Sequence, residues 1–288
     1  MVDIIFTSLD RMRWIREISS HLDMFAKYNH KIDIRIIFDS ALKSEDVNPV
    51  HLVTLACMIE YIARRNGHVS MDTKSDVANM IYEKLRFHEY WKGGKNYAET
   101  ELGHIFNIWR IDDNKKEVYS KNVEEYFQRS MFKGKDLSPI SITMNEAFYN
   151  VFDHAEADGN AFSCIQYEQE TTKLMIAICD LGKGIARSVT DFDPSISSDV
   201  EALRRSIDID FTVKSRDHNR GWGLSNILEC AEWARIISNG AILIKSKGND
   251  NIRVMKYDPC FNGTLVFVDM YLEKTEDIGV WDSYDLNF

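Results

Sequence analysis

The chain has 288 residues, of which 44% are hydrophobic and 28% charged, and its formal net charge is −10. This length is sufficient for two ordinary domains, each with its own core. The acidic balance argues against a general nucleic-acid-binding protein, because nothing in it offsets the repulsion from phosphates.

The same composition gives expectations about the cellular location. No run of residues approaches the roughly 18 apolar positions of a membrane span, and the N-terminus lacks the pattern of a signal peptide. Five cysteines lie in apolar stretches without a Cys-x-x-Cys pair, which indicates free thiols in a reducing compartment. We therefore expect a cytoplasmic protein with neither a membrane nor a nucleic acid as its partner.

Strand and helix patterns alternate in the N-terminal part of the chain. β-Branched residues bounded by polar ones indicate strands, and apolar residues at helical spacing indicate helices. The expected elements are an amphipathic helix near 11–28, a strand over 31–39, a helix over 49–66, a strand over 68–72 and a helix over 74–87. This alternation predicts a small α/β domain over residues 1–92.

A second domain is expected over residues 138–272, after a charged connector over 93–137 that carries one strand and a helix near 122–128. The residues that follow, 273–288, form an acidic C-terminal tail. The expected elements of the domain are a helix over 140–155, strands over 161–167 and 174–180, a helix over 224–237, and strands over 241–246, 252–257 and 264–272. Helices on one face of a mixed sheet predict an α/β sandwich.

The first of three notable segments is the predicted helix over 140–155. Glu146 and Asn150 are four residues apart and share one helix face, and His154 continues the same row. An amide oxygen beside a carboxylate suits Mg²⁺, and the carboxylate can orient or deprotonate a water or hydroxyl near a γ-phosphate. A solvated polar stripe is the alternative for Glu146 and Asn150, and helix packing is the alternative for His154.

The second segment, Asp180-Leu-Gly182-Lys-Gly184, follows an apolar predicted strand. An aspartate at a strand end can accept a hydrogen bond from an adenine amino group, and the glycines let the backbone approach the base and ribose. A glycine turn between a strand and a loop would explain the same residues.

The third segment, Gly221-Trp-Gly223-Leu224, opens a predicted helix. Glycine allows backbone amides to approach phosphate oxygens at the positive end of a helix. The polar loop before it contains cations that can fold over a triphosphate, namely Lys214, Arg216 and Arg220. A solvated loop capped by a glycine turn is the alternative. The order of all three segments favours a nucleotide site over these separate alternatives.

Together the segments resemble the three nucleotide-binding motifs of the Bergerat-fold (GHKL) ATPases, which include gyrase and the histidine kinases. The resemblance covers residues 138–272 and implies that the chain binds ATP and Mg²⁺. It implies these roles: Glu146 as the catalytic carboxylate, Asn150 as the Mg²⁺ ligand, Asp180 as the adenine reader, Gly182 and Gly184 beside the base, Gly221, Gly223 and Leu224 at the phosphates, and Thr264 of the Gly263-Thr264 pair beside Asp180. The loop between Gly184 and Gly221 corresponds to the ATP lid.

The Glu-Ala-x-x-Asn-x-x-x-His form of the first motif resembles the anti-sigma-factor serine kinases more than the sensor histidine kinases. Residues 31–92 resemble a divergent STAS domain, the fold of anti-anti-sigma factors, in the order and length of their elements. Phosphorylatable STAS domains carry a serine or threonine just before the first helix. Here that stretch reads Asp46-Val-Asn48-Pro49, and Ser44 is the nearest hydroxyl but lies out of register.

These resemblances imply an ATP·Mg²⁺-binding regulatory protein that resembles the anti-sigma-factor serine/threonine kinases and acts with a protein partner in partner switching; serine/threonine kinase activity is one of the functions they leave open. Two alternatives stay open: an ATP-gated interaction module without kinase activity, and an ATPase. The fusion of two such domains favours the gated module, because fused partners meet at a high effective concentration. A homodimer through the second domain, as relatives form, is compatible with the resemblance.

Overall fold

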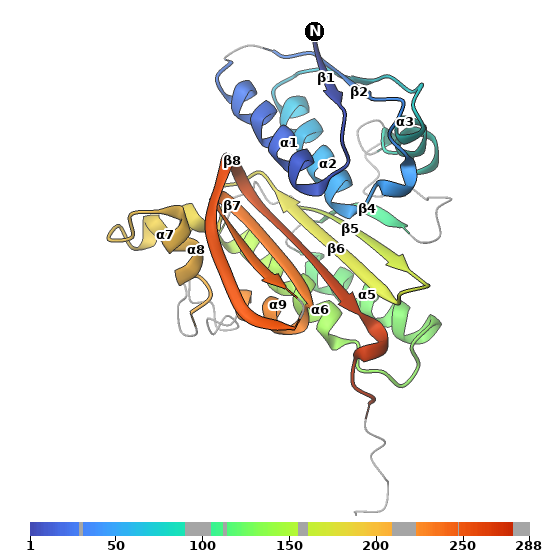
Figure 1. Cartoon of the computed structure of the whole chain (residues 1–288), viewed down its shortest axis with the longest axis vertical. Coiled ribbons are helices and arrows are strands. Elements are labelled where there is room, and N and C mark those ends of the chain that lie inside the picture. The colour runs from blue at the N-terminus through green and yellow to red at the C-terminus, as the bar shows by residue number, and fades with distance from the viewer. Residues whose placement is uncertain are drawn as a thin grey trace, which may run out of the picture.

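The computed structural model describes residues 1–28, 31–89, 105–111, 114–154, 161–208, 223–246 and 248–278. Within them the chain is a mixed α/β protein with one parallel and one antiparallel sheet. The two sheets alternate with two layers of helices, so that the elements form a four-layer stack (Figure 1). Among the described helices, none is both long enough and apolar enough to cross a bilayer.

The N-terminal sheet contains three parallel strands in the order β1-β2-β3, which are β1 (Val2–Phe6), β2 (Ile34–Phe38) and β3 (Val69–Met71). Parallel neighbours require crossover connections, and α1 (Arg11–Ala26) and α2 (Pro49–Arg64) provide them. The strand and helix predictions for this part are confirmed, whereas β1 was not predicted.

Side chains at the first turns fix where these two helices begin. Asp10 caps α1 by accepting a hydrogen bond from the Arg13 backbone N–H, and Asn48 caps α2 together with His51 in a capping box. A short 3₁₀ turn, Ser44–Asp46, precedes α2. The predicted helix over 74–87 is α3 (Asp76–Asn79), which continues as a π-helical turn over Met80–Lys84.

The second sheet has five strands in the order β4-β5-β6-β8-β7. They are β4 (Ile105–Ile111), β5 (Ala161–Glu168), β6 (Lys173–Asp180), β7 (Trp233–Ser246) and β8 (Asn249–Tyr271). All neighbouring pairs are antiparallel, so the predicted mixed sheet is wrong. The reason is the long β7–β8 hairpin, which places β8 between β6 and β7 and antiparallel to both.

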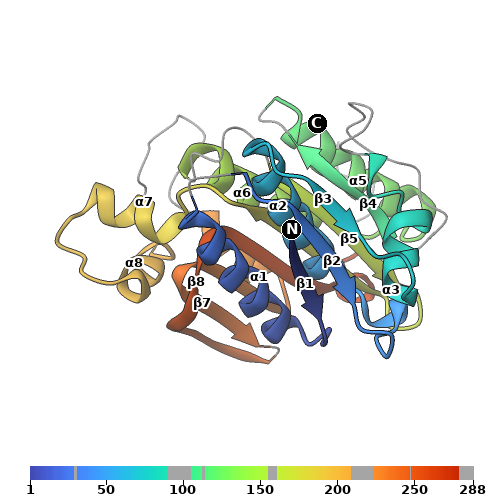
Figure 2. The same cartoon turned by 90° about the horizontal axis from the view of Figure 1, so that it is seen from above.

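Among the described elements, five helices cover one face of this sheet: α5 (Lys116–Ser130), α6 (Ser138–Tyr149) with a π-helical turn over Asn150–His154, α7 (Ile185–Phe192), α8 (Asp199–Arg205) and α9 (Gly223–Cys230). In both views α7 and α8 lie at one end of the sheet, away from α5 (Figures 1 and 2). The predicted helix over 224–237 is wrong beyond Cys230. Residues 233–236 alternate in burial and pair with β8, as expected of a strand.

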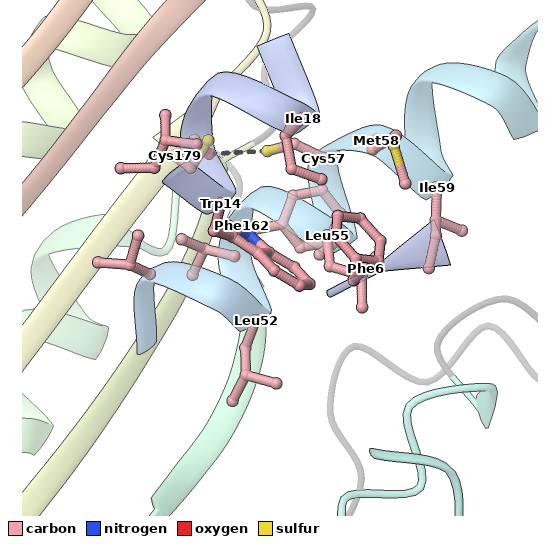
Figure 3. Close-up of a cluster of buried hydrophobic side chains, with 14 of the residues drawn as sticks. Phe6, Trp14, Ile18, Leu52, Leu55, Cys57, Met58, Ile59, Phe162 and Cys179 are labelled. Carbon is pink, nitrogen blue, oxygen red and sulfur yellow. Dashed lines mark hydrogen bonds between the residues drawn. The ribbon is translucent and has the colours of Figure 1, made fainter. Parts of the chain in front are cut away.

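The helices of residues 138–272 lie on one face of the five-stranded sheet, as predicted, whereas the covering of its other face by the N-terminal part was not predicted. Helices α1 and α2 lie between the two sheets, and their side chains form one apolar cluster with residues of β5, β6 and β8. Figure 3 shows Trp14, Leu52 and Cys57 in this cluster near Phe162 and Cys179. Twelve of the sixteen residues of α2 are buried, because a sheet lies on each side of the helix.

Candidate functional site

Helices α6 and α9 bring the first and third sequence segments together. Glu146 on α6 accepts a hydrogen bond through Oε1 from Asn226 Nδ2 on α9, at 2.9 Å. A Cβ atom added to Gly223, the first residue of α9, would lie 3.0 Å from Glu146 Oε2 and 3.8 Å from Asn150 Nδ2. The backbone at the start of α9 therefore lies directly against Glu146 and Asn150.

Asn150 follows the last residue of α6 and is held by the helix itself. Its Nδ2 donates a hydrogen bond to the Glu146 backbone oxygen at 2.8 Å. Since the amide nitrogen points back to the helix, Oδ1 is the end of this amide that can meet a ligand. Burial raises the pKa of Glu146, and the hydrogen bond from Asn226 opposes that rise. A raised pKa makes Glu146 a better proton acceptor for a bound hydroxyl or water.

The second segment forms a separate polar group at the end of β6. Asp180 is 1% exposed, and its Oδ1 accepts a hydrogen bond from the Gly182 backbone N–H at 2.7 Å. Thr264 lies opposite Asp180 in the β6–β8 pairing. Within the described part of the chain, Asp180 Oδ2 and Thr264 Oγ1 are both buried without a hydrogen-bond partner.

Such unsatisfied groups are rare in native proteins, because each loses its bonds to water. Burial raises the pKa of Asp180 to about 7, and hydrogen-bonding interactions with the Gly182 N–H and with the Thr264 backbone and hydroxyl act against that rise. The Thr264 hydroxyl therefore lies close to Asp180, but within the described residues no hydrogen bond of good geometry joins the two side chains. A ligand with an N–H donor beside an acceptor would satisfy both orphaned atoms. This is the chemistry that one edge of a purine base presents.

At two positions close to Asp180, contacts within the chain leave no room for a side chain and so require glycine. Gly263 has φ +122°, and a Cβ atom on it would lie 2.2 Å from the Asp180 backbone oxygen. Gly184 has φ +83°, and its Cβ atom would lie 2.5 Å from Asn239 Oδ1. A glycine turn therefore explains Gly184 without any ligand. The placement of Gly184 beside a base stays a prediction.

Asn239 and Ser238 of β7 hold the loop after Asp180, and sequence reasoning missed both. Asn239 has φ +52°; its Nδ2 donates to the Lys183 backbone oxygen at 3.0 Å, and its Oδ1 accepts from the Arg187 N–H at 3.2 Å. Ser238 Oγ accepts from the Ala186 N–H at 3.3 Å. The available signal was the polar Ser-Asn-Gly interruption in an apolar run.

Asn226 was also missed, although it lies three residues after Gly223 and so on the same side of α9. Leu224 is 3% exposed and belongs to the apolar cluster between the helices and the sheet, which gives it a packing role. The π-helical turn that begins at Asn150 contacts α7, which starts one residue after Gly184. The contact between this π-helical turn and α7 thus connects the part of the site that contains Glu146 with the part that contains Asp180.

Part of the predicted site lies outside the described residues: Lys214, Arg216, Arg220, Gly221 and the side chain of His154. The predicted lid, between Gly184 and Gly221, contains α7 and α8 in its described portion. The described residues contain no group of three His, Cys, Asp or Glu side chains placed to hold a metal ion. Glu146 and Asn150 do offer oxygen ligands, which suits Mg²⁺ because this ion retains several waters.

Comparison with known proteins does not assign this chain to a family. No family model matches this sequence, and no curated protein is significantly similar to it.

Proposed function

We propose that this chain binds ATP and Mg²⁺ at the site formed by Glu146, Asn150 and Asp180. In this proposal residues 138–272 form a Bergerat-type nucleotide-binding domain, and the N-terminal part is STAS-like. The protein acts as a regulatory protein of the anti-sigma-factor serine/threonine kinase type, together with a protein partner. The observation that carries the proposal is the close approach of the Gly223 backbone to Glu146 Oε2 and Asn150.

In this proposal each residue has a role that its position supports. The backbone amides at the start of α9 face phosphate oxygens, because the first N–H groups of a helix lack partners within it. Asn150 Oδ1 is placed to bind Mg²⁺, which supplies charge neutralisation at the phosphates when bound. Glu146 holds or accepts the proton of the attacking hydroxyl. Asp180 Oδ2 accepts from the adenine amino group, and the Thr264 hydroxyl completes that edge.

A second candidate is an ATP-gated interaction module without phosphate transfer. It is supported by the contact between α2 and the nucleotide side of the molecule: Cys57 Sγ donates to the Cys179 backbone oxygen at 3.4 Å (Figure 3). Cys179 immediately precedes Asp180. A nucleotide that binds Asp180 therefore lies one residue from a contact with the N-terminal part, so contiguous packed residues join the two.

The test compares the wild type with Glu146→Gln, Asp180→Asn and Glu229→Gln. Glu229 is an exposed residue on α9, so its substitution is the matched control. Binding of Mg·ATP is measured by calorimetry, and ADP and the intact protein mass are measured after incubation. We expect Asp180→Asn to weaken ATP binding by roughly tenfold, since it removes an acceptor that is buried with the base.

Glu146→Gln separates the two candidates. For a kinase, this variant retains ATP binding and loses the formation of ADP or of phosphorylated protein, while Glu229→Gln behaves as the wild type. For a gated module, no variant or wild type produces ADP, although ATP binds. A wild-type protein that shows no saturable binding of Mg·ATP would refute both.

A further inference from the structure

Two adjoining cavities lie where the N-terminal part meets the five-stranded sheet, away from the Glu146 and Asp180 groups. One has a volume of about 660 Å³ and is lined by the loops that follow β1 and β2 and by Arg235 of β7. The other, of about 250 Å³, is lined by Trp233, Phe267 and Asp269 of β7 and β8. Arg11 and Arg235 line both cavities, so the two adjoin at these side chains and are together called the seam cleft.

The two arginines at the centre of the seam cleft have few acceptors. Among the described residues, no carboxylate lies within 4.0 Å of the Arg235 guanidinium, and the side chain is half-buried. Within the described part of the chain, Arg11 reaches Asp269 at 4.0 Å and the Met175 sulfur at 3.4 Å, and the Asp269 carboxylate also interacts electrostatically with Arg235. A guanidinium carries five N–H donors, and a sulfur is a weak acceptor. Arg11 comes from α1 and Arg235 comes from β7. Most of the N–H donors of these two guanidinium groups are therefore available to an external anion.

The larger cavity lies at a position in the N-terminal fold that favours ligand binding. It is bounded by the carboxyl ends of β1 and β2, where open parallel sheets commonly bind ligands. The neutral side chain of Asn48 caps α2 there, so the positive end of that helix also faces the cavity. Of the two carboxylates in its lining, Asp10 is bound to a first-turn N–H of α1 and Asp46 is exposed.

The smaller cavity supplies a surface for an apolar group. Trp233 is 38% exposed, which is unusual for a large aromatic side chain and leaves its ring accessible to a ligand. The Arg235 guanidinium lies over the Phe267 ring, 5.8 Å from its centre. This cation–π contact holds Arg235 in place between the two cavities.

We infer that the seam cleft is a second ligand site, which binds a small organic oxyanion. The phosphate or carboxylate head lies between Arg11 and Arg235, and an aromatic or apolar body lies against the exposed ring of Trp233. Because guanidinium groups pair with both kinds of head in a bidentate manner, the chemistry shared by the ligands is an oxyanion next to an apolar group. This site is independent of the proposed ATP site.

The experiment titrates the full-length protein with phenyl phosphate, benzoate, inorganic phosphate and uncharged benzyl alcohol, and follows binding by calorimetry. The variants are Arg235→Met and Arg11→Met, with Arg253→Met as the matched control, because Arg253 is an exposed residue of β8 outside the cleft. We expect saturable binding of at least one aryl anion, weaker binding of benzyl alcohol, and a loss of roughly tenfold in affinity in each cleft variant. Arg253→Met should bind as the wild type does.

Two further measurements keep the inference open to refutation. Asn150→Ala should leave aryl-anion binding unchanged; if it abolishes binding while Arg235→Met does not, the anion occupies the Glu146–Asn150 site and the seam cleft is not a ligand site. If a cleft variant fails to fold, the indole N–H resonance of Trp233 in the wild type, assigned with Trp233→Phe, should shift with the anion. Absence of saturable binding by either aryl anion would also overturn the inference.

Discussion

Replacing Asp180 by asparagine should change how the stability of the protein depends on pH. The carboxyl group is fully buried, with Oδ1 bonded to the Gly182 N–H and Oδ2 unsatisfied within the described residues. Burial disfavours the charged form, and the pKa of Asp180 is therefore raised to about 7. Asparagine has the same shape and stays neutral at every pH, and it can keep the acceptor for Gly182.

The magnitude follows from the difference in pKa between the folded and unfolded chain. Each pKa unit corresponds to about 1.4 kcal/mol, and a folded pKa of about 7 against the ordinary 3.8 gives at most about 4 kcal/mol. Between these pH values the folded state binds a proton that the unfolded state has lost. The stabilisation is therefore complete below pH 3.8 and is lost as the pH rises through about 7.

The assay is urea denaturation of the ligand-free wild type and of Asp180→Asn at several pH values from acid to slightly alkaline. The difference between the two proteins isolates Asp180 from the other carboxyl groups, and Asp23→Asn, an exposed residue paired with Lys27, is the control. We expect Asp180→Asn to gain stability relative to the wild type as the pH rises through this window. Parallel curves for the two proteins would refute the burial argument.

Two other substitutions test the packing around the site and in the helix layer. Gly263→Ala should cost roughly 3 kcal/mol or more in urea denaturation, because the new Cβ atom would lie 2.2 Å from the Asp180 backbone oxygen at a φ of +122°. Gly248→Ala, with φ +67° and nothing within 4 Å, is its control and should cost only about 1 kcal/mol. Trp14→Phe should lower the free energy of unfolding by about 2 kcal/mol in the same assay. The substitution removes the 2.9 Å hydrogen bond from the indole N–H to Thr54 and leaves a gap in the core. An unchanged midpoint of denaturation would contradict this role of Trp14.

Local patterns in the sequence were sufficient to predict several elements that position the candidate site. The spacing of Glu146 and Asn150 predicted a helix face, and these residues lie together at the end of α6. The apolar run before Asp180 predicted a strand that ends at this residue, and β6 does end there. In each case the signal lies within about ten neighbouring residues, where helix and strand periods are directly readable.

The errors arose where distant parts of the chain determine the structure. The apolar residues from Leu224 to Ile237 fit a helical period, but pairing with β8 takes residues from 233 onward into a strand. The polar residues Ser238 and Asn239 gain their role only because β7 lies beside the loop that follows Asp180. No local sequence pattern distinguishes these two residues from the residues of an ordinary turn, since their partners lie more than fifty positions away.

The burial of α1 and α2 between two sheets also has a consequence for synthesis of the chain. These helices leave the ribosome before the strands that cover one of their faces, namely β5, β6 and β8, and the last of these strands ends only at Tyr271. At usual elongation rates the 207 residues from the end of α2 at Arg64 to Tyr271 take on the order of ten seconds or more to make. Until β8 is complete, the apolar faces that will meet Phe267 lack their final cover. The nascent N-terminal part is thus a strong candidate substrate for chaperones that bind exposed apolar segments.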